Sequence, residues 1–181
     1  MWPHTVAILI GGQSRRMGSP KHLVELANGN TMFQMMLKFA HTFSERIIIL
    51  GGEIEGQQCI SDLRLHHGPV GGIEAMLHSN IDSKYLVVGC DMPSIREKDV
   101  QPFLSCNTNA VFVNDKRILG LPLLIHEETK DACTAYLDSG GRSIKGFVSE
   151  IPHSKIAISS MQCDVLRSVN TREDINKLTL E

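Results

Sequence analysis

A short segment after the first apolar run concentrates groups that bind phosphate. It reads Leu9-Ile-Gly-Gly-Gln-Ser-Arg-Arg-Met-Gly-Ser-Pro-Lys21, and its phosphate-binding candidates are Gly11, Gly12, Ser14, Arg15, Arg16 and Lys21. Paired glycines let a backbone turn sharply and approach a ligand, because no Cβ intrudes. Successive N–H groups in such a loop form a nest for phosphate oxygens. Arginine adds a planar fork and lysine a mobile point charge, so the segment predicts a polyphosphate site rather than a loop of solvated charges.

Two common nucleotide motifs do not fit this segment. A P-loop requires GxxxxGK[ST], and no Lys-Ser or Lys-Thr pair follows a glycine here. The dinucleotide fingerprint requires GxGxxG leading into a helix, and the glycine spacing is different. We therefore expect a phosphate-binding loop of another type.

A carboxylate that could bind a cation follows another apolar run. Val87-Val-Gly-Cys-Asp-Met-Pro93 is a hydrophobic strand pattern that ends in Asp91, and Pro93 then stops further pairing. An acidic side chain at the carboxyl end of a strand suits a hard cation with its phosphates. The alternative is that Asp91 only caps a turn.

Elements that position these groups are indicated by alternating strand and helix patterns. Short apolar, β-branched runs predict buried strands at Thr5–Ile10, Arg46–Leu50, Lys84–Cys90, Ala110–Val113 and Leu121–Ile125. Helical patterns cover Met32–Phe43, capped by Thr31 or Asn30, and Gly72–Ser79. Weaker helix patterns occur at Arg96–Leu104, Thr129–Leu137, Ser143–Glu150 and Arg172–Leu178.

This alternation predicts βαβ crossovers and a mostly parallel, Rossmann-like sheet in a three-layer α/β/α sandwich. We find no repeat, linker or low-complexity tract, so we expect a single domain over residues 1–181. In such folds the ligand binds beyond the carboxyl ends of the strands. We therefore expect the chemistry just after Ile10, Leu50 and Cys90.

Bulk properties exclude several classes of protein. The net charge of -2 gives no reason to expect a nucleic-acid partner. The five cysteines lack CxxC spacing, which argues against a zinc site and favours reduced thiols. No apolar stretch is long enough for a membrane span, and no targeting segment precedes the first strand. We expect a soluble, cytoplasmic protein without membrane contact.

The first segment resembles the LxGGxSxRMGxxK motif of the molybdenum cofactor guanylyltransferases, the MobA-like group of nucleotidyltransferases. The matching residues are Leu9, Gly11, Gly12, Ser14, Arg16, Met17, Gly18 and Lys21. Related cytidylyl- and uridylyltransferases typically begin Ala-Ala-Gly, so the Gly-Gly pair favours guanine. Pro20 departs from the family pattern, which commonly has aspartate before the lysine. The resemblance implies the fold of the nucleotide-diphospho-sugar transferases.

Three further segments extend the resemblance from about Val6 to Leu178. His67–Ile73 is similar to the family segment GPLxGI, which implies that Gly68 and Gly71 approach the nucleotide, although a turn at the start of a helix is the alternative. Asp62 stands six residues before Gly68 and matches a family aspartate of the base and sugar pocket.

Asp91 matches the family's magnesium ligand, and the segment Ser168–Asp174 resembles the closing motif NxNTPEDL. That motif implies Asn170 as a second ligand on the metal side. From the residues alone, Thr171 and Asp174 form a helix capping box. Leu121 replaces a histidine that the family often has before Pro-Leu, which leaves the acceptor open.

The resemblance implies transfer of GMP from GTP to molybdopterin, or its molybdenum-loaded form, with release of pyrophosphate and with Mg²⁺ as cofactor. Transient contact with other proteins of molybdenum cofactor biosynthesis is a further expectation. The implied catalytic residues are Arg16, Lys21 and Asp91, and the implied metal ligands are Asp91 and Asn170. The implied nucleotide-binding residues are Leu9, Ile10, Gly11, Gly12, Ser14, Lys21, Asp62, Gly68, Gly71 and Asp91.

Two alternatives stay open at this point. One is a related nucleotidyltransferase that uses CTP or another phosphorylated acceptor, which Pro20 and Leu121 keep open. The other is a non-catalytic nucleotide-binding homologue. The presence of Arg16, Lys21 and Asp91 argues against the second, because a decayed site should lose these side chains first.

Overall fold

The computed structural model describes residues 1–11 and 20–178. Within these residues, seven strands form one sheet in the order β3-β2-β1-β4-β6-β5-β7. The strands are β1 (Thr5–Leu9), β2 (Ile47–Leu50), β3 (Cys59–Ile60), β4 (Lys84–Gly89), β5 (Ala110–Asn114), β6 (Arg117–His126) and β7 (Ser154–Ala157). Only β6 runs antiparallel to its neighbours, while the other pairs are parallel. The predicted mostly parallel α/β sheet is confirmed.

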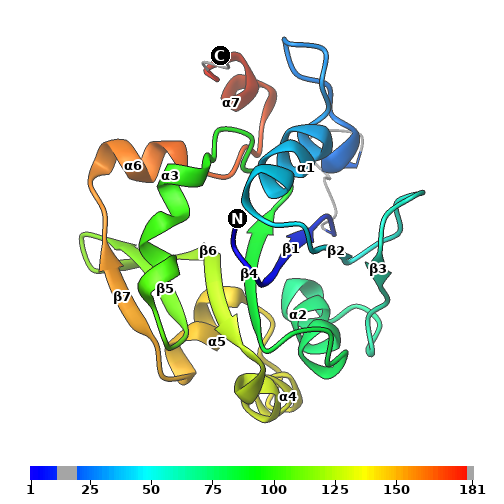
Figure 1. Cartoon of the computed structure of the whole chain (residues 1–181), viewed down its shortest axis with the longest axis vertical. Coiled ribbons are helices and arrows are strands. Elements are labelled where there is room, and N and C mark those ends of the chain that lie inside the picture. The colour runs from blue at the N-terminus through cyan, green and yellow to red at the C-terminus, as the bar shows by residue number, and fades with distance from the viewer. Residues whose placement is uncertain (12–19, 179–181) are drawn as a thin grey trace.

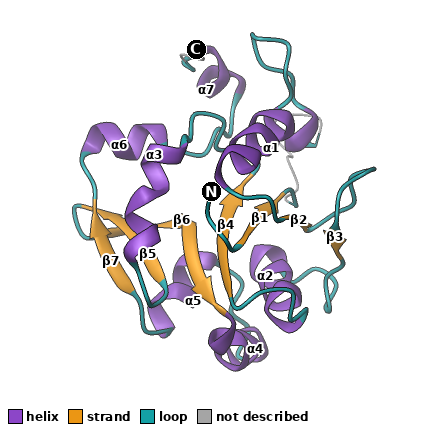
Figure 2. Cartoon of the chain, viewed as in Figure 1, coloured by secondary structure: helices purple, strands orange, loops and turns teal. Residues whose placement is uncertain are grey.

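Helices cover both faces of this sheet (Figures 1 and 2). They are α1 (Met32–Phe43), α2 (Gly68–His78), α3 (Glu97–Val100), α4 (Lys130–Asp138), α5 (Ile144–Glu150), α6 (Ser160–Val165) and α7 (Arg172–Asn176), with short 3-10 turns between some of them. α1 and α3 pack on one face, and α2, α4 and α5 pack on the other. No helix in the described part of the chain is long and apolar enough to cross a membrane.

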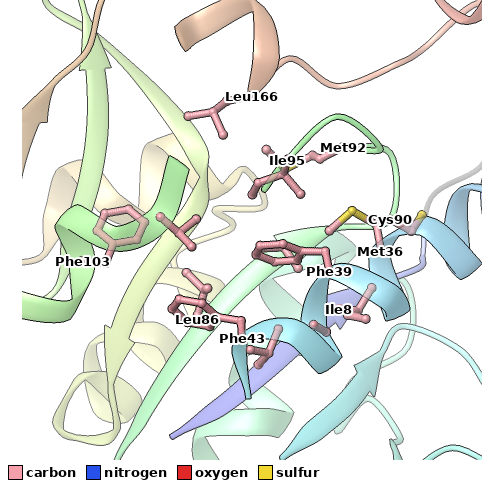
Figure 3. Close-up of a cluster of buried hydrophobic side chains, with 14 of the residues drawn as sticks. Ile8, Met36, Phe39, Phe43, Leu86, Cys90, Met92, Ile95, Phe103 and Leu166 are labelled. Carbon is pink, nitrogen blue, oxygen red and sulfur yellow. The ribbon is translucent and has the colours of Figure 1, made fainter. Parts of the chain in front are cut away.

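Alternation of side chains along the strands divides the core into two layers. Figure 3 shows one of them, in which Phe39 and Phe43 of α1 lie beside Ile8 of β1 and Leu86 of β4. Neighbouring positions such as Leu9 point to the opposite face and pack with α2, α4 and α5. A central strand that is apolar on both faces is what burial between two helix layers requires.

The helix α1 connects the core to the loop that follows β1. Thr31 Oγ1 accepts a hydrogen bond from the Gln34 backbone N–H at 3.1 Å, and Gln34 Oε1 accepts from the Thr31 N–H at 2.7 Å. This capping box fixes the start of the helix, as the sequence predicts with Thr31. The 3-10 turn Lys21–Leu23 packs against α1, so the helix helps to hold Lys21 in place.

Several boundaries differ from the sequence prediction. The helix α2 begins at Gly68 rather than Gly72, because Pro69 suits a helical first turn, where its missing N–H costs no hydrogen bond. The expected helix Arg96–Leu104 divides into α3 and a 3-10 turn at Gln101–Ser105, since Pro102 cannot donate to the helical ladder. The strands β3 and β7 and the helix α6 are short and lacked a distinct apolar pattern.

Candidate functional site

The carboxyl ends of β1, β2 and β4 meet in close backbone contact. The Ile10 N–H donates to the Leu50 carbonyl at 3.0 Å, and the Cys90 N–H donates to the Leu9 carbonyl at 2.9 Å. A Cβ on Gly11 would lie 2.9 Å from the Gly51 carbonyl oxygen. Glycine at position 11 is therefore required by the approach of two backbones, whatever ligand binds above them.

Three side chains that are far apart in the sequence converge beside these strand ends. The Lys21 ammonium lies 2.8 Å from Asp91 Oδ2 and 2.5 Å from Asn170 Oδ1, and it donates to both oxygens. The side chains of Lys21 and Asp91 are each 19% exposed, so solvent screens this ion pair only in part. The sequence singled out all three residues, and the structure brings them together.

Backbone contacts hold Asp91 and Asn170 in this arrangement. The Val169 N–H donates to the Asp91 carbonyl at 2.8 Å, which ties the segment before α7 to the end of β4. A Cβ on Gly89 would lie only 2.5 Å from Asp91 Oδ1, so the carboxylate packs on the bare Gly89 backbone. The position of Asp91 thus depends on a glycine that the sequence pattern did not single out.

The start of α7 presents Asn170 through the predicted capping box. Asp174 Oδ2 accepts from the backbone N–H groups of Asn170 at 3.0 Å and Thr171 at 2.9 Å, while Thr171 Oγ1 accepts from the Asp174 N–H. The hydrogen bonds that the Asp174 carboxylate accepts lower its pKa. The bond from the Asn170 N–H has the largest effect, and Thr171 contributes next. The cap therefore leaves the Asn170 side-chain oxygen free to contact Lys21.

A second group of predicted residues lies against the first turn of α2. Asp62 Oδ1 would be 3.5 Å from a Cβ on Gly72, and Asp62 Oδ2 would be 3.9 Å from one on Gly71. Asp62 Oδ1 is shielded from solvent and has no hydrogen-bond partner among residues 1–11 and 20–178. This burial raises the pKa of Asp62, and the nearby His67 opposes the effect.

Gly72 itself belongs to this group, although the sequence prediction chose Gly68 and Gly71. A Cβ on Gly72 would lie 3.3 Å from Leu50 Cβ and 3.4 Å from Leu9 Cδ2. We call Leu9–Gly11, Asp62, Gly71 and Gly72 the glycine-lined side of the site. Gly68 begins the same turn of α2, and a Cβ there would face the Arg142 carbonyl at 3.6 Å. Gly12, Ser14 and Arg16 lie outside the described residues.

A cavity of about 900 Å³ opens on the other side of Asn170. Its cationic lining residues are Arg117, Arg142, Lys145 and Arg167, and its apolar lining residues are Ile118, Leu119, Leu121, Ile144 and Leu166. We call it the arginine-lined cavity. Its cations come from β6, from the loop before α5, from α5 itself and from the segment after α6. The sequence prediction missed this set, because residues so scattered form no motif.

The oxygens of Asp91 and Asn170 can hold a hard cation, since they already converge on one ammonium group. Mg²⁺ prefers oxygen ligands, and it is usually held by one or two carboxylates together with substrate phosphates. The two oxygens are therefore of the kind that Mg²⁺ prefers, and Mg²⁺ binding by Asp91 and Asn170 stays a prediction.

The family model and the sequence relatives agree on one family. The model of the MobA-like NTP transferase domain matches residues 6–153. A molybdenum cofactor guanylyltransferase of Shewanella sediminis is 30% identical, with 95% of this chain and 93% of that protein covered. A probable molybdenum cofactor guanylyltransferase of Flavobacterium johnsoniae is 24% identical over 97% of this chain and 96% of its own length.

Solved structures show the same fold. The molybdopterin-guanine dinucleotide biosynthesis protein A of Archaeoglobus fulgidus superposes with a TM-score of 0.78 at 19% identity, and 96% of each chain is covered. The family match spans the strand ends that carry Leu9–Gly11, Asp62 and Asp91, whereas Asn170 lies beyond it. From the family model and the 30% identical relative, the chain belongs to the MobA-like NTP transferase family of nucleotidyltransferases.

Proposed function

We propose that this chain transfers GMP from GTP to molybdopterin, or to its molybdenum-loaded form, and releases pyrophosphate in a Mg²⁺-dependent reaction. The observation that carries the proposal is the convergence of Lys21, Asp91 and Asn170 between the glycine-lined side and the arginine-lined cavity. The names of the curated relatives, molybdenum cofactor guanylyltransferases, support the choice of substrates.

The glycine-lined side suits the nucleotide donor. Glycine at positions 11 and 71 lets the Gly51 backbone and the segment of Asp62 pack closely beside the strand ends. The half-buried Asp62 carboxylate is a strong acceptor for N–H or O–H groups of the nucleoside, because burial has removed part of its hydration. The segment 12–19, with Ser14 and Arg16, belongs to the phosphate end in this proposal.

The arginine-lined cavity suits the acceptor. Four cations offer partners for the acceptor phosphate, and apolar side chains such as Leu121 and Ile144 offer a surface for a flat ring system. The cavity borders Asn170, so an acceptor phosphate in it would lie near the Lys21–Asp91 pair. Electrostatic attraction would also concentrate an anionic substrate there.

The reaction requires positioning and charge stabilisation more than proton transfer. A phosphate oxygen of the acceptor attacks the α-phosphorus of GTP in line, and the bond to pyrophosphate breaks. The attacking oxygen is already anionic, so no strong general base is required. The barrier lies in bringing anions together in line. The Lys21 ammonium neutralises charge that develops toward pyrophosphate.

Asp91 and Asn170 would hold Mg²⁺, which supplies further neutralisation of the phosphates when bound. In the structure Lys21 contacts both of these oxygens. One ammonium and one metal ion cannot occupy the same place, so with Mg²⁺ held by Asp91 and Asn170 the Lys21 ammonium would be free to contact the phosphates. Its flexible four-carbon stem permits that movement.

The first test is calorimetric binding of GTP, CTP, ATP and UTP in the presence of Mg²⁺. We expect a preference for GTP that Asp91→Ala and Lys21→Ala reduce, followed by formation of the guanine dinucleotide when molybdopterin is added. A preference for CTP would move the chain to the cytidylyl branch, for which Pro20 and Leu121 are the sequence observations. Absence of nucleotide binding would contradict an enzymatic role.

A further inference from the structure

Arg64 connects the segment that carries Asp62 to the helices α2 and α4 through two ion pairs. Arg64 Nη2 lies 3.0 Å from Glu74 Oε1 on α2, and Arg64 Nη1 donates to Asp138 Oδ1 at the end of α4. The two carboxylates differ sharply in exposure, 2% for Glu74 and 61% for Asp138. Arg64 therefore makes one buried ion pair and one at the surface.

Glu74 is an unusual residue for the inner face of a helix. Its Oε1 accepts from the Thr134 hydroxyl at 2.9 Å as well as from Arg64, and its Oε2 has no partner in the described part of the chain. A buried ion pair contributes little net stability, because desolvation offsets the attraction between the charges. It does restrict geometry, since separating the charges in the interior is unfavourable.

The Arg64–Glu74 pair restricts the geometry of the glycine-lined side. A Cβ on Gly71 would be 3.8 Å from the Arg64 carbonyl and 3.9 Å from Asp62 Oδ2, so the segment lies directly on the first turn of α2. The Arg64 side chain then reaches the same helix at Glu74. The flanking Leu63 and Leu65 are 61% and 79% exposed and do not anchor the segment in the core.

We propose that Arg64 and Glu74 form a positioning pair that holds Asp62 in place for the nucleoside of GTP. This inference rests on the proposed function, in which Asp62 accepts from the nucleoside. The pair comes from elements other than those that carry Lys21, Asp91 and Asn170. Its loss should therefore weaken GTP binding and leave turnover at saturating GTP nearly unchanged.

The test measures the GTP dissociation constant, kcat, both KM values and the melting temperature for Arg64→Met and Glu74→Gln. We expect the GTP dissociation constant to rise about tenfold in each, the scale of coupling within one polar network, with kcat within about twofold. Asp138→Asn is the matched control, and it should change affinity less than about threefold, because exposed ion pairs contribute little. Arg64→Lys keeps a cation beside Glu74 and should retain most of the affinity.

A double-mutant cycle with Asp62→Asn separates positioning from general support of the fold. If the pair acts through Asp62, Arg64→Met should cause little further loss of GTP affinity once the Asp62 carboxylate is absent. An equal loss in both backgrounds, together with parallel losses of kcat and melting temperature, would show a purely structural role and overturn the inference. Unchanged GTP affinity in Arg64→Met and Glu74→Gln would also overturn it.

GTP binding by the wild-type chain tests the proposed function separately from the positioning pair. If that chain binds no GTP, the proposed function fails before any variant is compared. If it binds GTP and the variants bind equally well, the proposed function stands and the positioning pair is wrong. Should Arg64→Met fail to fold, Arg64→Lys and Glu74→Gln provide the same comparison.

Discussion

The two sides of the site are built in different ways. On the glycine-lined side, backbone and small residues lie so close that a Cβ on Gly11 would come within 2.9 Å of the Gly51 carbonyl. The arginine-lined cavity is instead an open hollow of about 900 Å³, lined by long charged and apolar side chains from several elements. The first side should be sensitive to any added atom, whereas the second should tolerate the loss of any single charge. Lys21, Asp91 and Asn170 lie between them and should be the most sensitive of all.

The largest effect is expected from Asp91→Ala. Removing the carboxylate takes away the proposed metal ligand and leaves Lys21 without its ion-pair partner, so pyrophosphate release should slow by about 10³-fold. Asp131→Ala is the matched control, because Asp131 is an exposed acidic residue in the first turn of α4 and lines neither region of the site, and it should stay within a few-fold of wild type. A tenfold or smaller effect of Asp91→Ala would place the chemistry elsewhere.

Loss of the Lys21 ammonium should have the next largest effect on turnover. We expect Lys21→Ala to lower kcat by roughly 10²–10³, by analogy with removal of one electrostatic donor to a transition state. Lys38→Ala is a suitable control, since Lys38 is an exposed lysine on α1 that contacts Asn30. Steady-state rates with both substrates saturating measure the effect. Turnover within a few-fold of wild type would contradict the role of Lys21.

The difference between the glycine-lined side and the arginine-lined cavity also explains which site residues could be predicted from the sequence. Leu9–Gly11 and Asp91 lie at the ends of β1 and β4, so one contiguous motif and one strand pattern were enough to indicate them, whereas Asp62 and Gly71 came from the family resemblance. The strand and helix patterns also predicted the mostly parallel sheet, because strands buried on both faces are strongly apolar. Asn170 came from a motif that also caps α7. The structure confirms the capping box, and Asn170 as a metal ligand stays a prediction.

The residues that the sequence prediction missed have a common physical reason. Gly89 supports Asp91 and Gly72 supports Asp62 only through contacts that a side chain would block. Arg117 lies in the same cavity as Lys145 and Arg167 because β6 runs antiparallel and starts at the edge where the parallel strands end. Patterns along the chain describe neighbours in sequence, and they do not reveal contacts between distant segments.

Adding one carbon at Gly89 should separate chemistry from donor binding. The new Cβ in Gly89→Ala would lie 2.5 Å from Asp91 Oδ1, so the carboxylate must turn away while the backbone keeps its conformation. A displacement of that size should lower kcat by about 10- to 100-fold. Gly72→Ala is the counterpart, because its Cβ contacts Leu9, Leu50 and Asp62 and should mainly raise the KM for GTP. Identical kinetic effects of the two variants would remove the distinction between the two regions.

Single charges of the arginine-lined cavity should matter less. Arg117→Gln should raise the KM for the acceptor roughly two- to fivefold and leave the KM for GTP unchanged, because exposed charge pairs contribute little. Adding Lys145→Gln should increase the effect and reduce its dependence on salt concentration. A change in the KM for GTP instead would assign this cavity to the donor.

The smallest effect concerns stability, and it connects the proposed role of Asp62 in GTP binding to its burial. Desolvation raises the pKa of Asp62 above the ordinary value of 3.8, so the folded chain holds this proton more tightly than the unfolded chain does. Stability from this group is therefore complete below pH 3.8 and is lost as the pH rises through the folded pKa. Asp62→Asn removes the ionisation, so the variant should melt at a higher temperature than wild type at pH 7.

The difference in melting temperature should decrease as the pH falls toward 3.8, because wild-type Asp62 then becomes neutral too. At pH 7 the same variant should bind GTP more weakly, since the amide offers the nucleoside a poorer acceptor than a carboxylate does. Thermal melts across this pH range and GTP titrations at pH 7 measure the two effects. A variant that gained stability and kept full GTP affinity would show that the desolvated carboxylate has no part in donor binding. The glycine-lined side would then contribute shape alone.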